Sequence, residues 1–273
     1  MENWIFLSKH GQDQYINMLA HSVGAEPYNS DHFDYYYDVF KENRKLVLRG
    51  ILKYKIMQQC WKDSRDFYFM DSGYLGNLKS PRNPNGNKNW HRIVRNDLQH
   101  QAVILRPADR VESLHIKLKN RRQGSRIIVA APDDKPCRFY GIDREQWIQD
   151  TVTKIKQHTD RPVIVRERAA RRSDRVLVDP LSQVLQDDVH ALVTFNSNAA
   201  VEAVIEGVPV FVLAPAHAAA PVGNRDLAQI EDPFWAPADQ RFEWLCHLAY
   251  CQYSVKELRN GTAFRMMNET QGH

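Results

Sequence analysis

The chain has 273 residues and a formal net charge of +4, with 43% hydrophobic and 26% charged residues. This composition is typical of a globular protein, and no apolar run approaches the roughly 20 residues that cross a bilayer. The N-terminus carries Glu2 where a signal peptide has basic residues, so we expect a cytoplasmic protein with no membrane partner.

Hydrophobic patterns in the first half of the chain predict strands that alternate with helices. The predicted elements are a strand at 4–7, a helix at about 13–22, a strand at 45–51, a helix at about 53–64 and a strand that starts at 66. Polar composition predicts loops at 28–40 and 80–100. A loop as long as the second one is usually functional or disordered.

The alternation is clearer in the second half, where Asp143 and Gln146 have the spacing of a helix capping box. The predicted elements are strands at 126–132, 161–168, 191–195 and 208–214, and helices at 143–158, 181–185 and 198–206. Strands that alternate with helices of this length imply βαβ crossovers and a mostly parallel sheet. We therefore predict an α/β fold with two Rossmann-like halves that face each other across a cleft.

Basic residues cluster in two segments of the chain. The clusters are Lys117, Lys119, Arg121, Arg122 and Arg126, and then Arg161, Arg166, Arg168, Arg171, Arg172 and Arg175. The first cluster marks the most natural joint, so we place the two domains at 1–120 and 121–273. Such clusters favour a polyanionic partner or a phosphate-bearing ligand, although a solvated charged linker has the same composition.

Cysteine and histidine residues do not follow a metal-binding pattern. The four cysteines are Cys60, Cys137, Cys246 and Cys251, without a C-x-x-C pair, and the histidines lack ligand spacing. We therefore expect reduced thiols, no catalytic metal and no tightly bound cofactor.

Glu202 lies off the apolar stripe of the predicted helix at 198–206. The stripe, which should face the sheet, consists of Val201, Val204, Ile205 and Val208. Glu202 is also too far from Ser197 to close a capping box, so a solvated glutamate favoured by the helix dipole is one explanation. The other is a ligand, because helix starts at the carboxyl ends of parallel strands bind phosphate and an acid one turn later binds ribose. This position predicts a nucleotide site.

Arg166 and Arg168 stand two residues apart at the end of a predicted strand, so their side chains should project to the same side. Two guanidinium groups on one side suit a diphosphate. The sequence has neither G-x-G-x-x-G nor a P-loop, and a nucleotide bound without those motifs indicates an enzyme that uses sugar nucleotides.

The segment FNSNAAVEAVIEGVPVFV at 195–212, followed by PVGNRDLAQIEDP at 221–233, resembles the donor half of GT-B glycosyltransferases. The resemblance covers roughly residues 126–255. Among these enzymes, the segment is similar to capsular-polysaccharide-type and phage DNA-modifying transferases. The resemblance implies a GT-B-like fold in which 1–120 bind the acceptor and 121–273 bind a nucleotide sugar, such as a UDP-sugar, as co-substrate.

The same resemblance implies roles for residues of the donor half. In the turn of Asn196, Ser197 and Asn198, the last two would contact the donor phosphates, and Glu202 would bind the ribose. Arg166 and Arg168 would face the diphosphate. Transfer of a hexose or a pentose would then proceed without a metal ion.

Two residues of the first half are candidates for the base that deprotonates an acceptor hydroxyl. Asp71 ends a predicted strand immediately before a turn that contains Gly73, and His91 lies in the segment NWHRIVRN. An aspartate of this kind is also ordinary turn chemistry, and the histidine fits a solvated surface position equally well.

Aromatic and basic residues near these candidates favour a nucleic-acid acceptor. The predicted contacts are Tyr74, Trp90, Arg92, Arg95, Lys117, Lys119, Arg121 and Arg122. Taken with these residues, the resemblance to phage DNA-modifying transferases implies the favoured hypothesis, which is transfer to a hydroxymethylated pyrimidine of DNA, such as hydroxymethylcytosine, by a phage-encoded enzyme in the host cytoplasm. The alternatives are a transferase of polysaccharide or glycan synthesis, and a non-catalytic nucleic-acid-binding protein, which would leave Glu202 unexplained.

Overall fold

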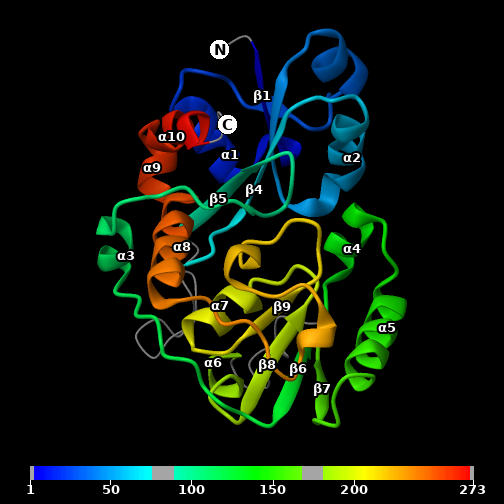
Figure 1. The fold of residues 1–273 in the computed structure, drawn as a ribbon. Coiled ribbons are helices and arrows are strands. Elements are labelled where there is room, and N and C mark those ends of the chain that lie inside the picture. Colours follow the sequence, from blue (N-terminus) through cyan, green and yellow to red (C-terminus); the bar gives the residue numbers. More distant parts are fainter. Residues whose placement is uncertain (1–2, 76–88, 168–180, 271–273) are drawn as a thin grey trace. The chain divides into compact units, whose positions relative to one another are not determined.

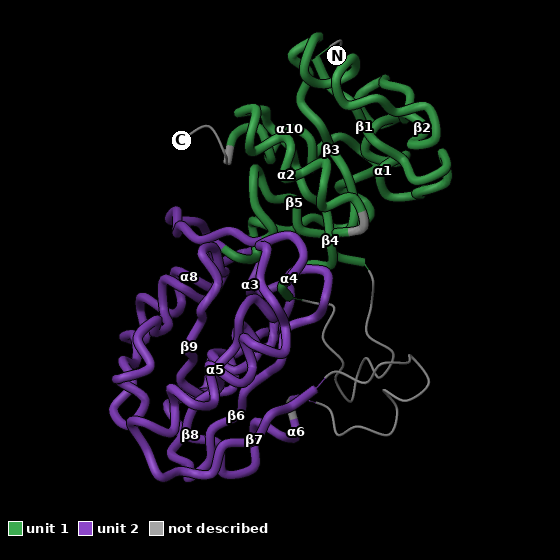
Figure 2. Tube along the Cα trace, turned by 90° about the vertical axis from the view of Figure 1, so that its right-hand side faces the viewer, with its two compact units in different colours: residues 1–98, 248–273 green, residues 99–247 purple. Residues whose placement is uncertain are grey.

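The computed structural model describes residues 3–75, 89–167 and 181–270, and the chain forms two compact units. The first contains residues 1–98 and 248–273, and the second contains residues 99–247 (Figure 2). These bounds differ from the expected joint at 120. Residues 99–120 belong to the second unit, and the chain returns to the first unit because its C-terminal segment adds a strand to the first sheet.

The first unit is built on a six-stranded sheet with the order β10-β5-β4-β3-β1-β2 (Figure 1). Its strands are β1 (Trp4–Ser8), β2 (Tyr28–Asn29), β3 (Lys45–Arg49), β4 (Phe67–Ser72), β5 (Trp90–Arg95) and β10 (Gln252–Ser254). Strands β1 to β4 are parallel, whereas β5 is antiparallel to both β4 and β10. The prediction of a loop at 80–100 is therefore wrong for 90–95, and residues 76–88 lie outside the described residues.

Helices of the first unit pack on both faces of this sheet. They are α1 (Gln14–His21), α2 (Tyr54–Lys62), α9 (Val255–Arg259) and α10 (Thr262–Thr270), with short turns η1 (Lys9–Gly11) and η3 (Ile51–Lys53) and a π-helix, η2 (Tyr36–Lys41). Asp13 begins α1 by accepting the backbone N–H groups of Tyr15 and Ile16 at 3.1 and 3.2 Å. Helices α1, α9 and α10 pack on residues from β1, β3, β4, β5 and β10, which form one core.

The second unit has a four-stranded sheet in which every strand is parallel, as predicted (Figure 1). The order is β7-β6-β8-β9, with β6 (Arg126–Ala130), β7 (Val163–Arg166), β8 (Val189–Thr194) and β9 (Val210–Val212). The chain leaves β6 to form β7 on one side and then crosses to form β8 on the other. The carboxyl ends of β6 and β8 are therefore the topological switch point, where ligands bind in open α/β sheets.

Helices cover both faces of the second sheet. They are α3 (Asp109–Leu114), α4 (Asp134–Tyr140), α5 (Arg144–Lys156), α6 (Leu181–Val184), α7 (Ala199–Ile205) and α8 (Ala238–Tyr250), with short turns η5 (Ala220–Val222) and η6 (Leu227–Gln229). Asp143 caps α5 and accepts the Gln146 N–H at 2.8 Å, but the predicted capping box is not closed, because the Gln146 side chain donates to Asp150 at 2.9 Å. Helix α5 and η6 bury one face, and α7 packs on β8 and β9.

Gly207, which follows α7, has a structural reason to be glycine. Its φ is +87°, and a Cβ there would lie 2.1 Å from the carbonyl oxygen of Asn120. The backbone N–H groups of Lys119 and Arg122 donate to the carbonyls of Ile205 and Gly207 at 2.9 and 2.7 Å. The basic segment 119–122 is therefore tied to the end of α7, and only glycine permits this close approach.

In the described part of the chain, no helix is both long and apolar enough to cross a membrane. The four cysteines, Cys60, Cys137, Cys246 and Cys251, are buried and form no disulfide. Burial raises the pKa of the Cys137 thiol to about 11 and that of Cys60 to about 12, so both are protonated at neutral pH.

Candidate functional site

Polar groups gather at the carboxyl edge of the second sheet, where the parallel strands end together. Arg166 is the last residue of β7, and the turn at 195–198 follows β8. The Thr194 hydroxyl donates to the Ala130 carbonyl at 3.0 Å and so joins the ends of β8 and β6. The predicted turn residues therefore stand at the switch point of this sheet.

The turn prepares the start of α7 but leaves one polar atom unsatisfied. The Ser197 hydroxyl accepts the N–H of Ala199 at 3.2 Å. Asn198 precedes the helix without using its side chain as a cap, and its Oδ1 is buried with no hydrogen-bond partner among the described residues. A buried acceptor without a donor costs free energy, so this atom is suited to a ligand that donates a hydrogen bond.

Glu202 lies one turn into α7 and is the most perturbed carboxylate of this edge. Its side chain is partly buried, and no residue in the described ranges forms a hydrogen bond with its carboxylate. Burial raises the pKa of Glu202 to about 7, although the positive charge of Arg166 acts in the opposite direction. A fully solvated surface glutamate would keep an ordinary pKa, so the burial of Glu202 favours the ligand explanation of this residue.

Arg166 and Arg144 contribute to this edge. Arg166 is partly buried, and its charge acts on Glu202, whereas Arg168 lies outside the described residues. The sequence analysis missed Arg144, whose Nε donates to the Pro132 carbonyl and whose Nη2 donates to Glu167, both at 2.9 Å. Arg144 thus links the segments that follow β6 and β7.

The sequence analysis also missed two residues that contact the 195–198 turn. The Gln99 side chain bonds the backbone of Asn196, and the His217 ring bonds the backbone of Ser197. Gln99 is 97 positions from Asn196, and no local pattern links them. His217, in contrast, lies in the loop that follows β9. Loops at the carboxyl ends of parallel strands often carry ligand-binding residues, so this position could have marked His217 as a candidate.

In the first unit, Asp71 lies at the carboxyl end of β4 and remains partly accessible. Its side chain is 37% exposed, and its Oδ2 is 3.5 Å from Nη2 of Arg92 on the neighbouring strand β5. The Ser72 N–H donates to Asp71 Oδ1 at 2.8 Å. The Asp71 carboxylate is therefore held by Arg92 and the Ser72 N–H and is still accessible to solvent.

His91 lies on the opposite face of the same sheet. It pairs with Ser72 in the register of β4 and β5, whereas Asp71 pairs with Arg92, so the two candidate bases point to different faces. His91 is only 1% exposed, and its ring centroid is 4.0 Å from that of Tyr15 in α1. Because a base must reach the acceptor proton, Asp71 is the stronger candidate.

The structure places several predicted nucleic-acid contacts where they are inaccessible. Tyr74 is fully buried, and the Arg92 guanidinium lies 5.1 Å from its ring centroid. Arg92 is 6% exposed and donates to the carbonyls of Ser72 and Leu98 at 2.7 and 3.2 Å. Trp90 is partly buried, and Arg95 is exposed but bonded to Asp66. Stacking by Tyr74 and phosphate binding by Arg92 therefore do not fit this structure.

Two of the four basic residues at 117–122 are bonded within the second unit. Lys119 pairs with Glu206 at 2.5 Å, and Arg122 donates to the carbonyls of Leu185 and Gln186. Lys117 and Arg121 are exposed to solvent. The contacts of Lys119 and Arg122 fix this segment to the second unit.

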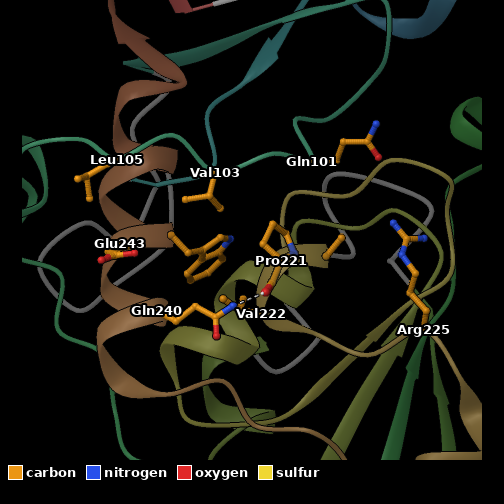
Figure 3. A pocket seen from close by; sticks show the side chains of 10 residues that line it. Gln101, Val103, Leu105, Pro221, Val222, Arg225, Gln240 and Glu243 are labelled. Carbon is orange, nitrogen blue, oxygen red and sulfur yellow. Dashed lines mark hydrogen bonds between the residues drawn. The ribbon is translucent and has the colours of Figure 1, made fainter. Parts of the chain in front are cut away.

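A separate pocket of about 650 Å³ opens in the second unit between the 101–105 segment, η5 and α8 (Figure 3). Its lining residues are Gln101, Val103, Leu105, Ala220, Pro221, Val222, Arg225, Gln240, Glu243 and Trp244. Gln240 Nε2 donates to the Pro221 carbonyl at 3.1 Å. None of the predicted donor residues lines this pocket. Within the described ranges, no three His, Cys, Asp or Glu residues form a potential metal-binding group.

The two α/β units with mostly parallel sheets define a GT-B-like fold, as the sequence predicted. No protein-family model matches the chain, and no curated protein sequence matches it significantly.

Two solved structures are similar to the chain over most of its length. One is Thermosulfurimonas dismutans KpsC, beta Kdo 2,4 transferase, with a TM-score of 0.53, 11% identity and 91% of each chain covered. The other is Thermosulfurimonas dismutans KpsC, beta Kdo 2,7 transferase, with a TM-score of 0.51 and 12% identity, covering 98% of this chain and 100% of that one. At this identity the likeness shows a shared fold. Neither structure is named as a DNA-modifying transferase.

Proposed function

We propose that the protein is a glycosyltransferase that moves a sugar from a nucleotide sugar to a hydroxyl of a glycan. The observation that carries this proposal is Glu202, a desolvated carboxylate without a hydrogen-bond partner among the described residues, placed near Arg166 at the switch point. Structural polar groups are normally satisfied within the protein, so a desolvated carboxylate without such a partner favours a ligand.

The chemistry of this edge suits a nucleotide. The Glu202 carboxylate can accept hydrogen bonds from two ribose hydroxyls, and Asn198 Oδ1 offers a further buried acceptor. Arg166 supplies the positive charge that a phosphate requires. The pairing of hydroxyl acceptors with one cation matches a ribose joined to phosphate better than it matches either group alone.

In the proposed reaction, Asp71 removes the proton of the acceptor hydroxyl as its oxygen attacks the anomeric carbon of the donor sugar. The bond from that carbon to the phosphate oxygen breaks, and the negative charge that develops on the leaving nucleotide is stabilised by Arg166. The transition state has oxocarbenium character, so positioning and electrostatic stabilisation supply the catalysis. The identity of the nucleotide, for which the sequence favoured a UDP-sugar, remains a prediction.

A glycan is the acceptor that best fits the available observations. Both similar structures are named as Kdo transferases. The residues proposed to bind DNA are largely engaged inside the protein, since Tyr74 and Arg92 are buried and Lys119 pairs with Glu206. DNA modification and a non-catalytic binding role are therefore the outcomes against which the proposal is tested.

The test combines ligand binding with transfer. Thermal unfolding is followed with cytidine, uridine and guanosine nucleotides and with duplex DNA, because a ligand that binds only the folded state raises the Tm. Transfer from each nucleotide sugar to an oligosaccharide and to hydroxymethylcytosine DNA is then read by mass spectrometry. We expect stabilisation by a nucleotide and a sugar adduct on the oligosaccharide. An adduct on DNA alone would establish the other acceptor, and stabilisation by DNA without any nucleotide effect would contradict an enzyme.

A further inference from the structure

One buried side chain, Gln99, joins the turn after β8 to the loop after β9. It is 2% exposed. Its Nε2 donates to the Asn196 carbonyl at 2.5 Å, and its Oε1 accepts the N–H of Ala218 at 2.9 Å. Both ends of the amide are therefore engaged, and each bonds the backbone of a different loop.

His217 makes a second connection between the same two loops. Its ring is fully buried, and Nδ1 accepts the N–H of Ala219 at 3.0 Å. Because Nδ1 acts as an acceptor, the proton of the neutral ring is on Nε2, which donates to the Ser197 carbonyl at 3.2 Å. Trp244 also contacts this loop, because its Nε1 donates to the Ala218 carbonyl at 2.6 Å.

These contacts explain how the turn keeps an unfavourable arrangement. Asn198 Oδ1 is buried without a partner, and the Glu202 carboxylate is desolvated without one, both among the described residues. Each unsatisfied group costs free energy, so a mobile turn would move to hydrate or pair them. The carbonyls of Asn196 and Ser197 are already bonded to Gln99 and His217, which opposes that movement.

We propose that Gln99 and His217 are positioning residues, which lock the loop after β9 onto the turn after β8 and hold Asn198 and Glu202 ready for the nucleotide. This inference rests on the proposed function, because it names the groups that keep that site in its binding geometry. Preorganisation of this kind raises affinity because the ordering is complete before the ligand arrives.

The first unit offers a matched control. Gln252 is fully buried and also bridges backbone groups with both ends of its amide, accepting the Leu75 N–H at 2.7 Å and donating to the Leu75 carbonyl at 3.1 Å. Gln252→Met and Gln99→Met therefore remove the same chemical groups from equally buried positions. Only Gln99→Met should affect the nucleotide site.

His217 permits a sharper comparison. In His217→Gln, the longer amide can still donate to the Ser197 carbonyl but no longer accepts the Ala219 N–H. In His217→Asn, the shorter amide can accept the Ala219 N–H but does not reach Ser197. A merely structural histidine would be affected similarly by both changes, whereas a positioning residue should tolerate glutamine better than asparagine.

The experiment measures amide hydrogen exchange and nucleotide affinity on the full chain. Exchange in the 195–202 and 213–219 segments should become faster in Gln99→Met and His217→Asn, and remain unchanged in Gln252→Met. The probe is whichever of CMP, CDP, UDP and GDP stabilises the wild type most. Its Kd should rise about tenfold in Gln99→Met and His217→Asn, because each variant loses a hydrogen bond that orders the turn before the nucleotide binds. The rise should be smaller in His217→Gln.

The results separate the connection between the two loops from the proposed function. Unchanged exchange in Gln99→Met would show that Gln99 does not hold the loops together, whether or not a nucleotide binds. Faster exchange with an unchanged Kd would overturn the positioning role. If no nucleotide binds the wild type, the proposed function and the positioning role both fail, while the exchange data still report whether Gln99 joins the loops.

Discussion

The carboxyl edges of the two sheets use their polar residues differently. In the first unit, Asp71 pairs with Arg92, and Arg49 at the end of β3 pairs with Asp13 at 3.1 Å. In the second unit, Glu202 and Asn198 Oδ1 have no hydrogen-bond partner among the described residues. Both edges therefore contain an unpartnered buried atom, since Nε of Arg49 also lacks a hydrogen-bond partner among the described residues. The carboxylates of the first edge are paired with arginines, however, whereas Glu202 forms no hydrogen bond with a described residue.

The difference assigns separate tasks to the two edges. An unsatisfied buried group costs about 1–3 kcal/mol and is retained where a ligand completes it, as proposed for the second unit. A general base has the opposite requirement, because a substrate must be able to reach it. Asp71 meets this requirement, since its side chain is 37% exposed.

The largest effect is expected at the first edge. Asp71→Asn should lower turnover by roughly 10²–10⁴-fold and leave nucleotide affinity unchanged, because it removes the proposed proton acceptor and leaves the residues of the proposed nucleotide site unaltered. The control is Asp66→Asn, which breaks the pair with Arg95 in the same sheet. Steady-state kinetics with near-normal turnover in Asp71→Asn would remove this residue from the reaction.

The next effect is expected at the second edge. Glu202→Ala should weaken nucleotide binding by about 1–3 kcal/mol, because ribose hydroxyls would lose their acceptors in a desolvated site. Glu206→Ala is a matched control. This glutamate directly follows α7, but its carboxylate pairs with Lys119. Titration calorimetry should distinguish the two variants, and equal affinities would contradict the assigned role of Glu202.

A smaller effect concerns stability and pH. The pKa of Glu202 is raised from 4.5 to about 7, so the native state binds more protons than the unfolded state between these values. Stability therefore falls as the pH rises through this window. Glu202→Gln removes the ionisable group. The free energy of unfolding of the variant minus that of the wild type should therefore be larger at pH 8 than at pH 5, by on the order of 1–2 kcal/mol. Urea unfolding at the two pH values measures this change, and a constant difference would indicate a solvated carboxylate.

The smallest effect is expected at the exposed basic residues. Replacing both Lys117 and Arg121 by alanine should change stability and oligosaccharide transfer by no more than about 0.5 kcal/mol, because they are exposed and lie outside the proposed site. A large loss of activity together with steep salt dependence would instead indicate a nucleic-acid acceptor.

Local sequence signals predicted much of the fold. The strands of the second sheet, the Asp143 cap and the position of Glu202 off the apolar stripe follow from residues that are adjacent or one helical turn apart. The π-helix at Tyr36–Lys41 lay in a segment predicted to be a loop. It depends on side-chain contacts such as the bond from Asp34 N–H to Asp38, which polar composition alone does not reveal.

The sequence by itself determined the alternation of strands and helices and the candidate nucleotide residues, because periodicity is a local property of the chain. Tertiary structure decided the rest. The pairing of β10 with β5, the burial of Tyr74 and the contacts of Gln99 join residues far apart in the sequence, with Leu75 and Gln252 177 positions apart. Such contacts depend on which surfaces meet during folding, and hydrophobic periodicity carries no information about that choice.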